Sequence, residues 1–127
     1  MFAKFSPASG RVLRAAEQTC RNHNHYYIGV EHVLAALLQE PDDAVRERLA
    51  REGVDAAEVH AELRRALGTG DDRSWEGILV TPRVRAIVAI AEKNAGDLIE
   101  PVDLLEAIET EGGSRAAELL RRSRARV

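Results

Sequence analysis

The sequence has little of what secreted, membrane-embedded or ATP-hydrolysing domains need. Its 127 residues include a single cysteine, which excludes an internal disulfide and favours a reducing compartment. No apolar run approaches the length of a membrane-spanning helix, and the opening MFAKFSPASG lacks the apolar stretch of a signal peptide. No segment matches the phosphate-binding loop G-x-x-x-x-G-K-[ST]. We therefore expect a cytoplasmic protein that does not bind ATP through such a loop.

Aromatic residues make up only 4% of the chain, whereas aliphatic residues and alanine dominate. Lysine and arginine number 18 against 21 acidic residues, a net charge of -3, which is typical of a soluble helical protein and does not indicate a nucleic-acid partner. The basic block at 121–126 is interpreted as a solvated helix end, where cations are favourable. The length suits one domain with one core.

The sequence does contain a degenerate copy of itself. The segment 5–49 recurs at 80–120, and Ser6-Pro7 matches Thr81-Pro82. Further matches pair Val12, Leu13, Ala16 and Glu17 with Ile87, Val88, Ala91 and Glu92, and then Ile28, Val33, Leu34 and Leu37 with Ile99, Leu104, Leu105 and Ile108. Between these two sets the second copy is about one helical turn shorter, so its helix is shortened without rotating its apolar face.

Helix start and stop signals divide both copies into helical hairpins. A serine or threonine before proline, at Ser6 and Thr81, predicts a capped helix start. We expect helices at about 7–21, 30–40, 43–52 and 56–67, and then at about 82–95, 101–110 and 114–123. The sequence thus predicts an all-α domain spanning 1–127, with about seven helices packed around one core. Repeat one covers about 4–68, a linker about 69–79, and a repeat two that is one helix shorter about 80–127.

Three segments, MFAKFSPASGRVLRAAEQ, HYYIGVEHVLAALL and VTPRVRAIVAIAE, resemble the Clp N-terminal domain, the duplicated helical module at the front of Clp-type AAA+ unfoldases. Members typically carry I-G-T-E-H in each repeat and T-P-R at the start of the second. Here the first motif reads Ile28-Gly29-Val30-Glu31-His32, T-P-R stands at 81–83, and the second motif has decayed to IEPVD at 99–103. The resemblance implies a non-enzymatic module that binds peptides or adaptors for Clp-mediated proteolysis. It implies protein partners, no cofactor, no nucleic acid and no membrane.

The resemblance also implies, as in some members, recognition of proteins tagged with phosphoarginine. Such a ligand needs an anion site for its phosphate and a carboxylate for its guanidinium N–H groups. The helix start at Ser6 could supply the anion site, Glu31 the carboxylate, and Gly29 room for close approach. Thr81 keeps the second helix start, but Val102 at the glutamate position cannot pair with a guanidinium. Asp103 or Glu100 could substitute for the glutamate from a neighbouring position. We predict at most one competent site per chain. The candidate ligand-binding residues are Ser6, Gly29, Glu31, His32 and Thr81.

Other interpretations of these residues stay open. Glu31 near a helix start is also typical of a capping residue, and His32 of a buried structural histidine that ties the loop to the helix. Cys20, His23 and His25 lie near His32 in the sequence, but Cys20 belongs to an apolar helix face and structural zinc needs four converging ligands. We therefore expect no metal site, and no nucleophile or carboxylate pair in the sequence predicts an enzyme.

In actinobacterial family members, cyclic-peptide antibiotics bind near an N-terminal phenylalanine, the residue before T-P-R and a basic residue after it. The matching residues here are Phe2, Val80 and Arg85, and Val80 offers no aromatic ring for stacking. Three hypotheses remain: a regulator or decoy that captures tagged substrates or adaptors, a protein that sequesters cyclic peptides, and a docking domain whose ligand site has decayed. We expect a monomer.

Overall fold

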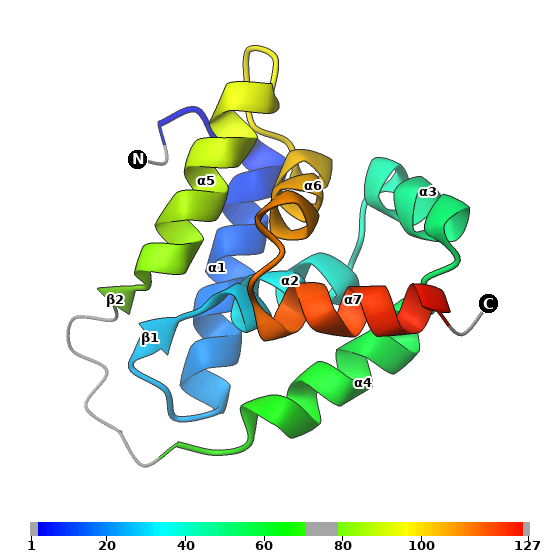
Figure 1. Cartoon of the computed structure of the whole chain (residues 1–127). Coiled ribbons are helices and arrows are strands. Elements are labelled where there is room, and N and C mark those ends of the chain that lie inside the picture. Colours follow the sequence, from blue (N-terminus) through cyan, green and yellow to red (C-terminus); the bar gives the residue numbers. More distant parts are fainter. Residues whose placement is uncertain (1–2, 71–78, 126–127) are drawn as a thin grey trace.

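The protein folds into helical hairpins, as Figure 1 shows, and the all-α prediction is confirmed. The structure is a computed structural model that describes residues 3–70 and 79–125. The helices of the described chain are α1 (Pro7–Asn22), α2 (Val30–Gln39), α3 (Asp43–Glu52), α4 (Ala56–Leu67), α5 (Pro82–Asn94), α6 (Pro101–Glu111) and α7 (Arg115–Ala125). Two strands of two residues each, β1 (Tyr27–Ile28) and β2 (Leu79–Val80), complete the fold. None of the helices described is long and apolar enough to cross a membrane.

The helix ends follow from local side-chain chemistry. Ser6 and Thr81 each accept a hydrogen bond from the backbone N–H three residues on, at 3.1 and 3.3 Å, and Asp55 does the same for α4. Asp42 caps α3, because its side chain accepts a hydrogen bond from the N–H of Val45 at 2.9 Å. Gly53 ends α3 in the left-handed conformation, at φ 70°, which favours glycine.

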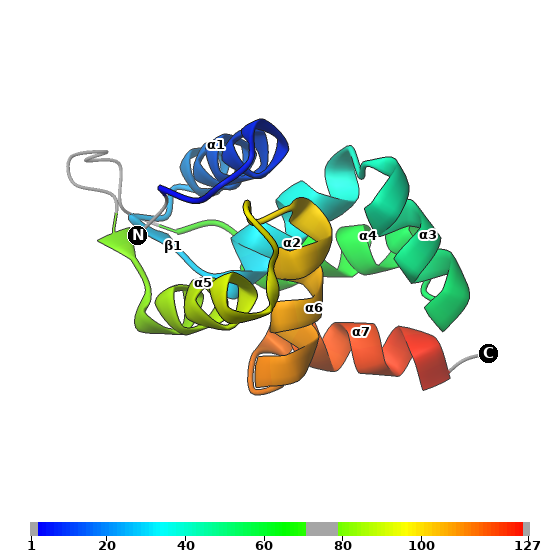
Figure 2. The same ribbon diagram turned by 90° about the horizontal axis from the view of Figure 1, so that it is seen from above.

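Buried side chains of both repeats join in one hydrophobic core. Helices α2 and α6 lie at its centre, with α1 and α5 on one side and α3, α4 and α7 on the other (Figure 2). Eight of the ten residues of α2 are buried, because this helix is covered by α1, α4 and α7. An apolar surface around the whole helix, rather than along one stripe, is typical of such a central helix.

The short strands connect the two repeats, and sequence reasoning did not predict them. Strand β1 pairs with β2 in parallel, with Ile28 opposite Val80. At the equivalent place on the other side of the repeat, Phe5 pairs with Ile99, also in parallel. The segment before the first helix of each repeat thus binds the segment before the second helix of the other repeat. This pairing between the repeats places the start of α5 beside the start of α2, and the start of α1 beside the start of α6.

The basic block near the end of the chain differs from expectation at Arg124, whereas Arg121 and Arg122 are exposed as expected. The side chain of Arg124 is only 30% exposed and forms ion pairs with Glu52 and Glu109. Arg121 donates a hydrogen bond to the carbonyl of Gly112 at 2.9 Å. These arginines attach α7 to α3 and α6, because carboxylates and carbonyls of neighbouring elements face them.

Candidate functional site at the junction of the repeats

The start of α5 forms the first half of the candidate site. Thr81 accepts from the N–H of Val84 through its hydroxyl, and its carbonyl accepts from the N–H of Arg85 at 3.1 Å. Pro82 has no N–H, which leaves the Arg83 amide as the one amide of this first turn with no acceptor in the described chain. The Arg83 side chain faces Glu111, at 3.8 Å. A free amide at the positive end of a helix dipole favours an anion.

Glu31 forms the second half. Its Oε2 lies 3.1 Å from the point that a Cβ on residue 29 would occupy, so Gly29 gives the carboxylate room. The preceding carbonyl, of Ile28, accepts a hydrogen bond from the N–H of Thr81 at 3.1 Å, which places the start of α2 beside the start of α5. Burial raises the pKa of Tyr27, and the negative charge of the nearby Glu31 adds to this shift. We call Gly29, Glu31, Thr81 and the Arg83 amide the Thr81–Glu31 junction.

His32 fixes the backbone of the junction through hydrogen bonds. It is fully buried, and its Nδ1 accepts from the N–H of Gly29 at 2.9 Å. An amide can only donate, so Nε2 carries the proton and donates to Nδ1 of His25, 2.9 Å away. Burial, with a smaller contribution from the charges of His25 and His23, lowers the pKa of His32 to about 4. The imidazole of His32 is therefore neutral and buried, and it positions Gly29. Both of its nitrogens form hydrogen bonds, so neither is left for a ligand.

The structure does not bring Ser6 and Glu31 together. The N–H of Ser6 donates to the carbonyl of Ile99 at 3.0 Å, at the start of α1. At the far end of α1 the Sγ of Cys20 donates to the carbonyl of Tyr27 at 3.0 Å, close to Glu31 in the chain. The segment before α1 thus pairs with the segment before α6, whereas the segment before α2 pairs with the segment before α5. Thr81 therefore takes the place beside Glu31 that the sequence had suggested for Ser6.

The equivalent junction at Ser6 has the same backbone pairing and lacks a carboxylate at the position of Glu31. Asp103 Oδ2 accepts from the N–H of Glu100 at 2.8 Å, as His32 does from Gly29. Val102 stands at the position of Glu31. Of the two junctions, only the one at Thr81 combines a helix start with a glutamate at that position. The sequence holds no signal that distinguishes the two helix starts, since Ser6-Pro7 and Thr81-Pro82 match each other.

The residues matched to cyclic-peptide binding lie only partly within the described chain. Phe2 lies outside the described residues, Val80 is half-buried against Ile28, and Arg85 is exposed. An apolar cavity of about 10 Å³ does lie between α1, α2, α5 and α6, where Leu13, Val30 and Val84 are among its lining residues. Such a volume corresponds to about one water molecule. A cyclic peptide would have to bind on the surface above it.

Cys20 has a structural environment. Its thiol is buried and donates to the carbonyls of His25 and Tyr27, at 2.9 and 3.0 Å. Burial raises the pKa of the Cys20 thiol, which disfavours the thiolate that metal binding or nucleophilic attack requires. Within residues 3–70 and 79–125 there is no group of three or more histidine, cysteine, aspartate or glutamate side chains that could hold a metal ion.

The fold and these motifs can be compared with known proteins. Residues 4–123 match the family described as the Clp repeat (R) N-terminal domain. The chain belongs to this family.

Similar proteins include the chaperone protein ClpB of Oceanobacillus iheyensis and the negative regulator of genetic competence ClpC/MecB of Bacillus subtilis. Each is 26% identical over 98 residues, which cover 77% of this chain and 12% of the relative. The chloroplastic chaperone protein ClpC of Pisum sativum is 25% identical over 124 residues, 94% of this chain and 13% of the relative. The chain thus spans a small fraction of the length of these relatives.

Two solved structures have the same fold. One, described as "Coevolution of the ATPase ClpV, the TssB-TssC Sheath and the Accessory HsiE Protein Distinguishes Two Type VI Secretion Classes", has a TM-score of 0.77 at 19% identity, covering 99% of this chain and 82% of its own. The other, described as "Preliminary structural investigations of a malarial protein secretion system", has a TM-score of 0.72 at 17% identity, covering 98% and 94%. At these identities the likeness concerns the fold.

Proposed function

We propose that the chain is a peptide- and adaptor-binding module of a Clp-type chaperone and protease system, without catalytic activity of its own. Membership of the Clp repeat family and the similarity to ClpB and ClpC chaperones support this link. The candidate site also supports it, because the Thr81–Glu31 junction presents an anion site and a carboxylate rather than a nucleophile with its base.

The ligand that this pair of groups fits is a phosphoarginine side chain. Its phosphate would meet the Arg83 amide and the dipole at the start of α5, and its remaining guanidinium N–H groups would donate to Glu31. Hydrogen bonds to charged groups contribute about 1.5–3 kcal/mol each, so loss of the Glu31 carboxylate should weaken binding about tenfold or more. The juxtaposition of Thr81 with Glu31 is the observation that carries this proposal.

Calorimetric titration with a phosphoarginine peptide, beside its plain-arginine twin, tests the proposal. We expect saturable binding at one site per chain and none with plain arginine. Glu31→Gln should weaken binding, whereas Glu40→Gln, the same chemical change at the exposed end of α2, should not. Ser6→Ala should leave the affinity unchanged, because Ser6 is not part of the junction. Two equivalent sites, or no heat at high peptide concentration, would count against a reader of this tag.

A further inference from the structure

A second concave surface lies on α4 and shares no lining residue with the Thr81–Glu31 junction. It is a groove of about 750 Å³ between the C-terminal half of α1 and α4, with part of α2 at its base. Its ionisable lining residues are His23, His60, Arg64 and Arg65, and no carboxylate lines it. The remaining lining residues are small or carry hydroxyl and amide groups, such as Thr19 and Asn22. We call this surface the α4 groove.

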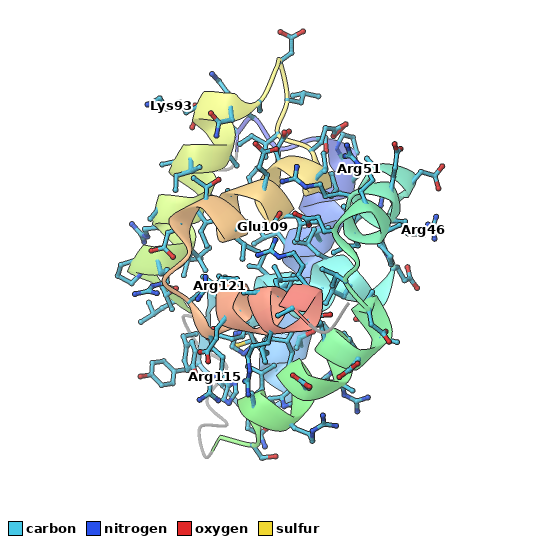
Figure 3. The ribbon with its side chains drawn as sticks, turned by 45° about the vertical axis from the view of Figure 1, so that its right-hand side comes forward. Arg46, Arg51, Lys93, Glu109, Arg115 and Arg121 are labelled. Carbon is cyan, nitrogen blue, oxygen red and sulfur yellow. The ribbon has the colours of Figure 1, made fainter. Side chains whose placement is uncertain are left out.

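The positive charge of the α4 groove continues toward α7. Arg65 also lines a neighbouring depression of about 350 Å³, whose other charged lining residues are Arg115, Arg122, Glu62 and Glu118. Within the described part of the chain, Arg64, Arg65, Arg115 and Arg122 form no ion pair, as is also true of Arg51 and Arg85. Figure 3 shows Arg115 beside the start of α7, on the side of the molecule opposite Arg46 and Arg51.

Helix stability does not account for all of these cations. Arg64 and Arg65 stand in the last turn of α4, where a positive charge is favourable to the helix dipole. Arg115 stands at the first residue of α7, where the same dipole opposes it. In a chain with a net charge of -3, two helices thus place on one surface arginines that form no ion pair with any described residue. Charge of this kind is complementary to an acidic partner.

We propose that the α4 groove binds an acidic peptide segment of a protein partner. The partner's carboxylates bind Arg64 and Arg65, and its backbone meets the hydroxyl and amide groups on α1. His60 and Arg64 are four residues apart on one face of α4, so the groove follows the helix lengthwise. The 12 residues of α4 span about 18 Å, which an extended peptide covers with about five or six residues.

A peptide fits this surface better than a single-stranded nucleic acid does. Proteins that bind single strands place aromatic rings along the basic groove for the bases to stack on. No phenylalanine, tyrosine or tryptophan is among the residues that line the described α4 groove. Carboxylates need only the arginines and hydrogen-bond donors that are present.

Fluorescence polarisation of labelled hexaglutamate tests the proposal. We expect saturable binding at low ionic strength that weakens as salt is added, because exposed charges are screened. Arg64→Glu with Arg65→Glu should weaken binding about tenfold or more. The matched control is Arg46→Glu with Arg51→Glu, which changes the net charge equally on exposed positions of α3 and should alter affinity by less than about twofold. Equal losses in both double variants, or no saturable binding, would overturn the proposal.

Two further arms separate the alternatives. A labelled thymidine hexanucleotide that binds as tightly as hexaglutamate would show a general polyanion surface and overturn the assignment to acidic peptides. Arg115→Glu with Arg122→Glu should give a smaller loss than the α4 variant, since these residues lie beyond the groove. Circular dichroism must show unchanged helicity in each variant. The α4 variant should still bind the phosphoarginine peptide, so the two proposals fail independently.

Discussion

The two junctions between the repeats share a backbone arrangement and differ in the side chains that they present. At one, Val80 pairs with Ile28, and at the other, Phe5 pairs with Ile99. In each, a side chain in the first turn of the second helix accepts from a backbone N–H at the helix start. The neighbouring position carries a carboxylate in one repeat and an isopropyl group in the other. The difference teaches that main-chain pairing and core packing can preserve this geometry after the group suited to a ligand has been lost.

The central helices differ as well. Ala35 and Leu38 of α2 are buried and apolar, whereas the aligned residues of α6 are Glu106 and Glu109. Figure 3 shows Glu109 between α6 and α7, and it is paired with Arg124. Burial, together with a hydrogen bond to Glu52 and that residue's charge, raises the pKa of Glu109 to about 7. One helix is therefore held by apolar contacts, and the other in part by a cluster of charges that contains an exchangeable proton.

Removing the two equivalent acceptors should have unequal effects. His32→Ala should destabilise the fold by about 3 kcal/mol, because it leaves a cavity and two unpaired groups, on Gly29 and His25. Asp103→Ala should cost about 1 kcal/mol, because its site is open to water. Urea unfolding of both variants measures the difference, and equal losses would mean that the buried histidine contacts add little.

The charged cluster should give stability a pH dependence. The folded chain binds the Glu109 proton more tightly than the unfolded chain, whose carboxyl has its ordinary pKa of 4.5. This contribution is fully present below that pKa and is lost as the pH rises through 7. In Glu109→Gln the change in unfolding free energy between pH 5 and pH 8 should therefore differ from that of the parent by about 2 kcal/mol.

Glu106→Gln is the matched control for that experiment, since Glu106 contacts the same Arg48 from the same helix but is half-exposed. Protonation of His32 and His25 affects parent and variants alike and cancels in the comparison. A Glu109→Gln variant whose stability follows the parent across this pH range would show that Glu109 is already ionised at pH 5.

Removing either helix cap should destabilise the fold by a similar amount, but only one removal should affect peptide binding. Thr81→Ala and Ser6→Ala each remove one side-chain acceptor, and each should cost about 1 kcal/mol in thermal or urea unfolding. Only Thr81→Ala should also lower the affinity for the phosphoarginine peptide, because it loosens the first turn of α5. A binding loss confined to Ser6→Ala would place the site at the other junction.

The smallest effect should come from rebuilding the second junction. Glu100→Gly with Val102→Glu copies the glycine and glutamate of the first repeat beside Ser6. We expect calorimetry to show a second, weaker site, since the Ser9 hydroxyl already donates to Ile99 there, at 2.7 Å, where the first junction has a valine. A single variant, Val102→Glu, controls for the added charge. Unchanged stoichiometry in the double variant would show that more than these two residues separates the junctions.

Much of the architecture could be predicted from the sequence. Ser6, Thr81 and Asp55 cap the helices that they were expected to cap, because capping depends on a few neighbouring residues. The match between repeats predicted the paired hairpins. The partner of Glu31 could not be predicted, since either helix start satisfies the same local signal. Arg124 was misread for a related reason, because its carboxylate partners come from α3 and α6.

The sequence by itself determined the duplicated helical fold, the helix ends and the loss of the glutamate in the second motif, since periodicity and caps act over one or two helical turns. Only the tertiary structure decided that the first helix of each repeat begins beside the motif of the other repeat, and that arginines of α4 and α7 gather on one surface. Both depend on contacts between segments distant in the chain, which arise when the apolar faces of the two repeats are buried in a shared core.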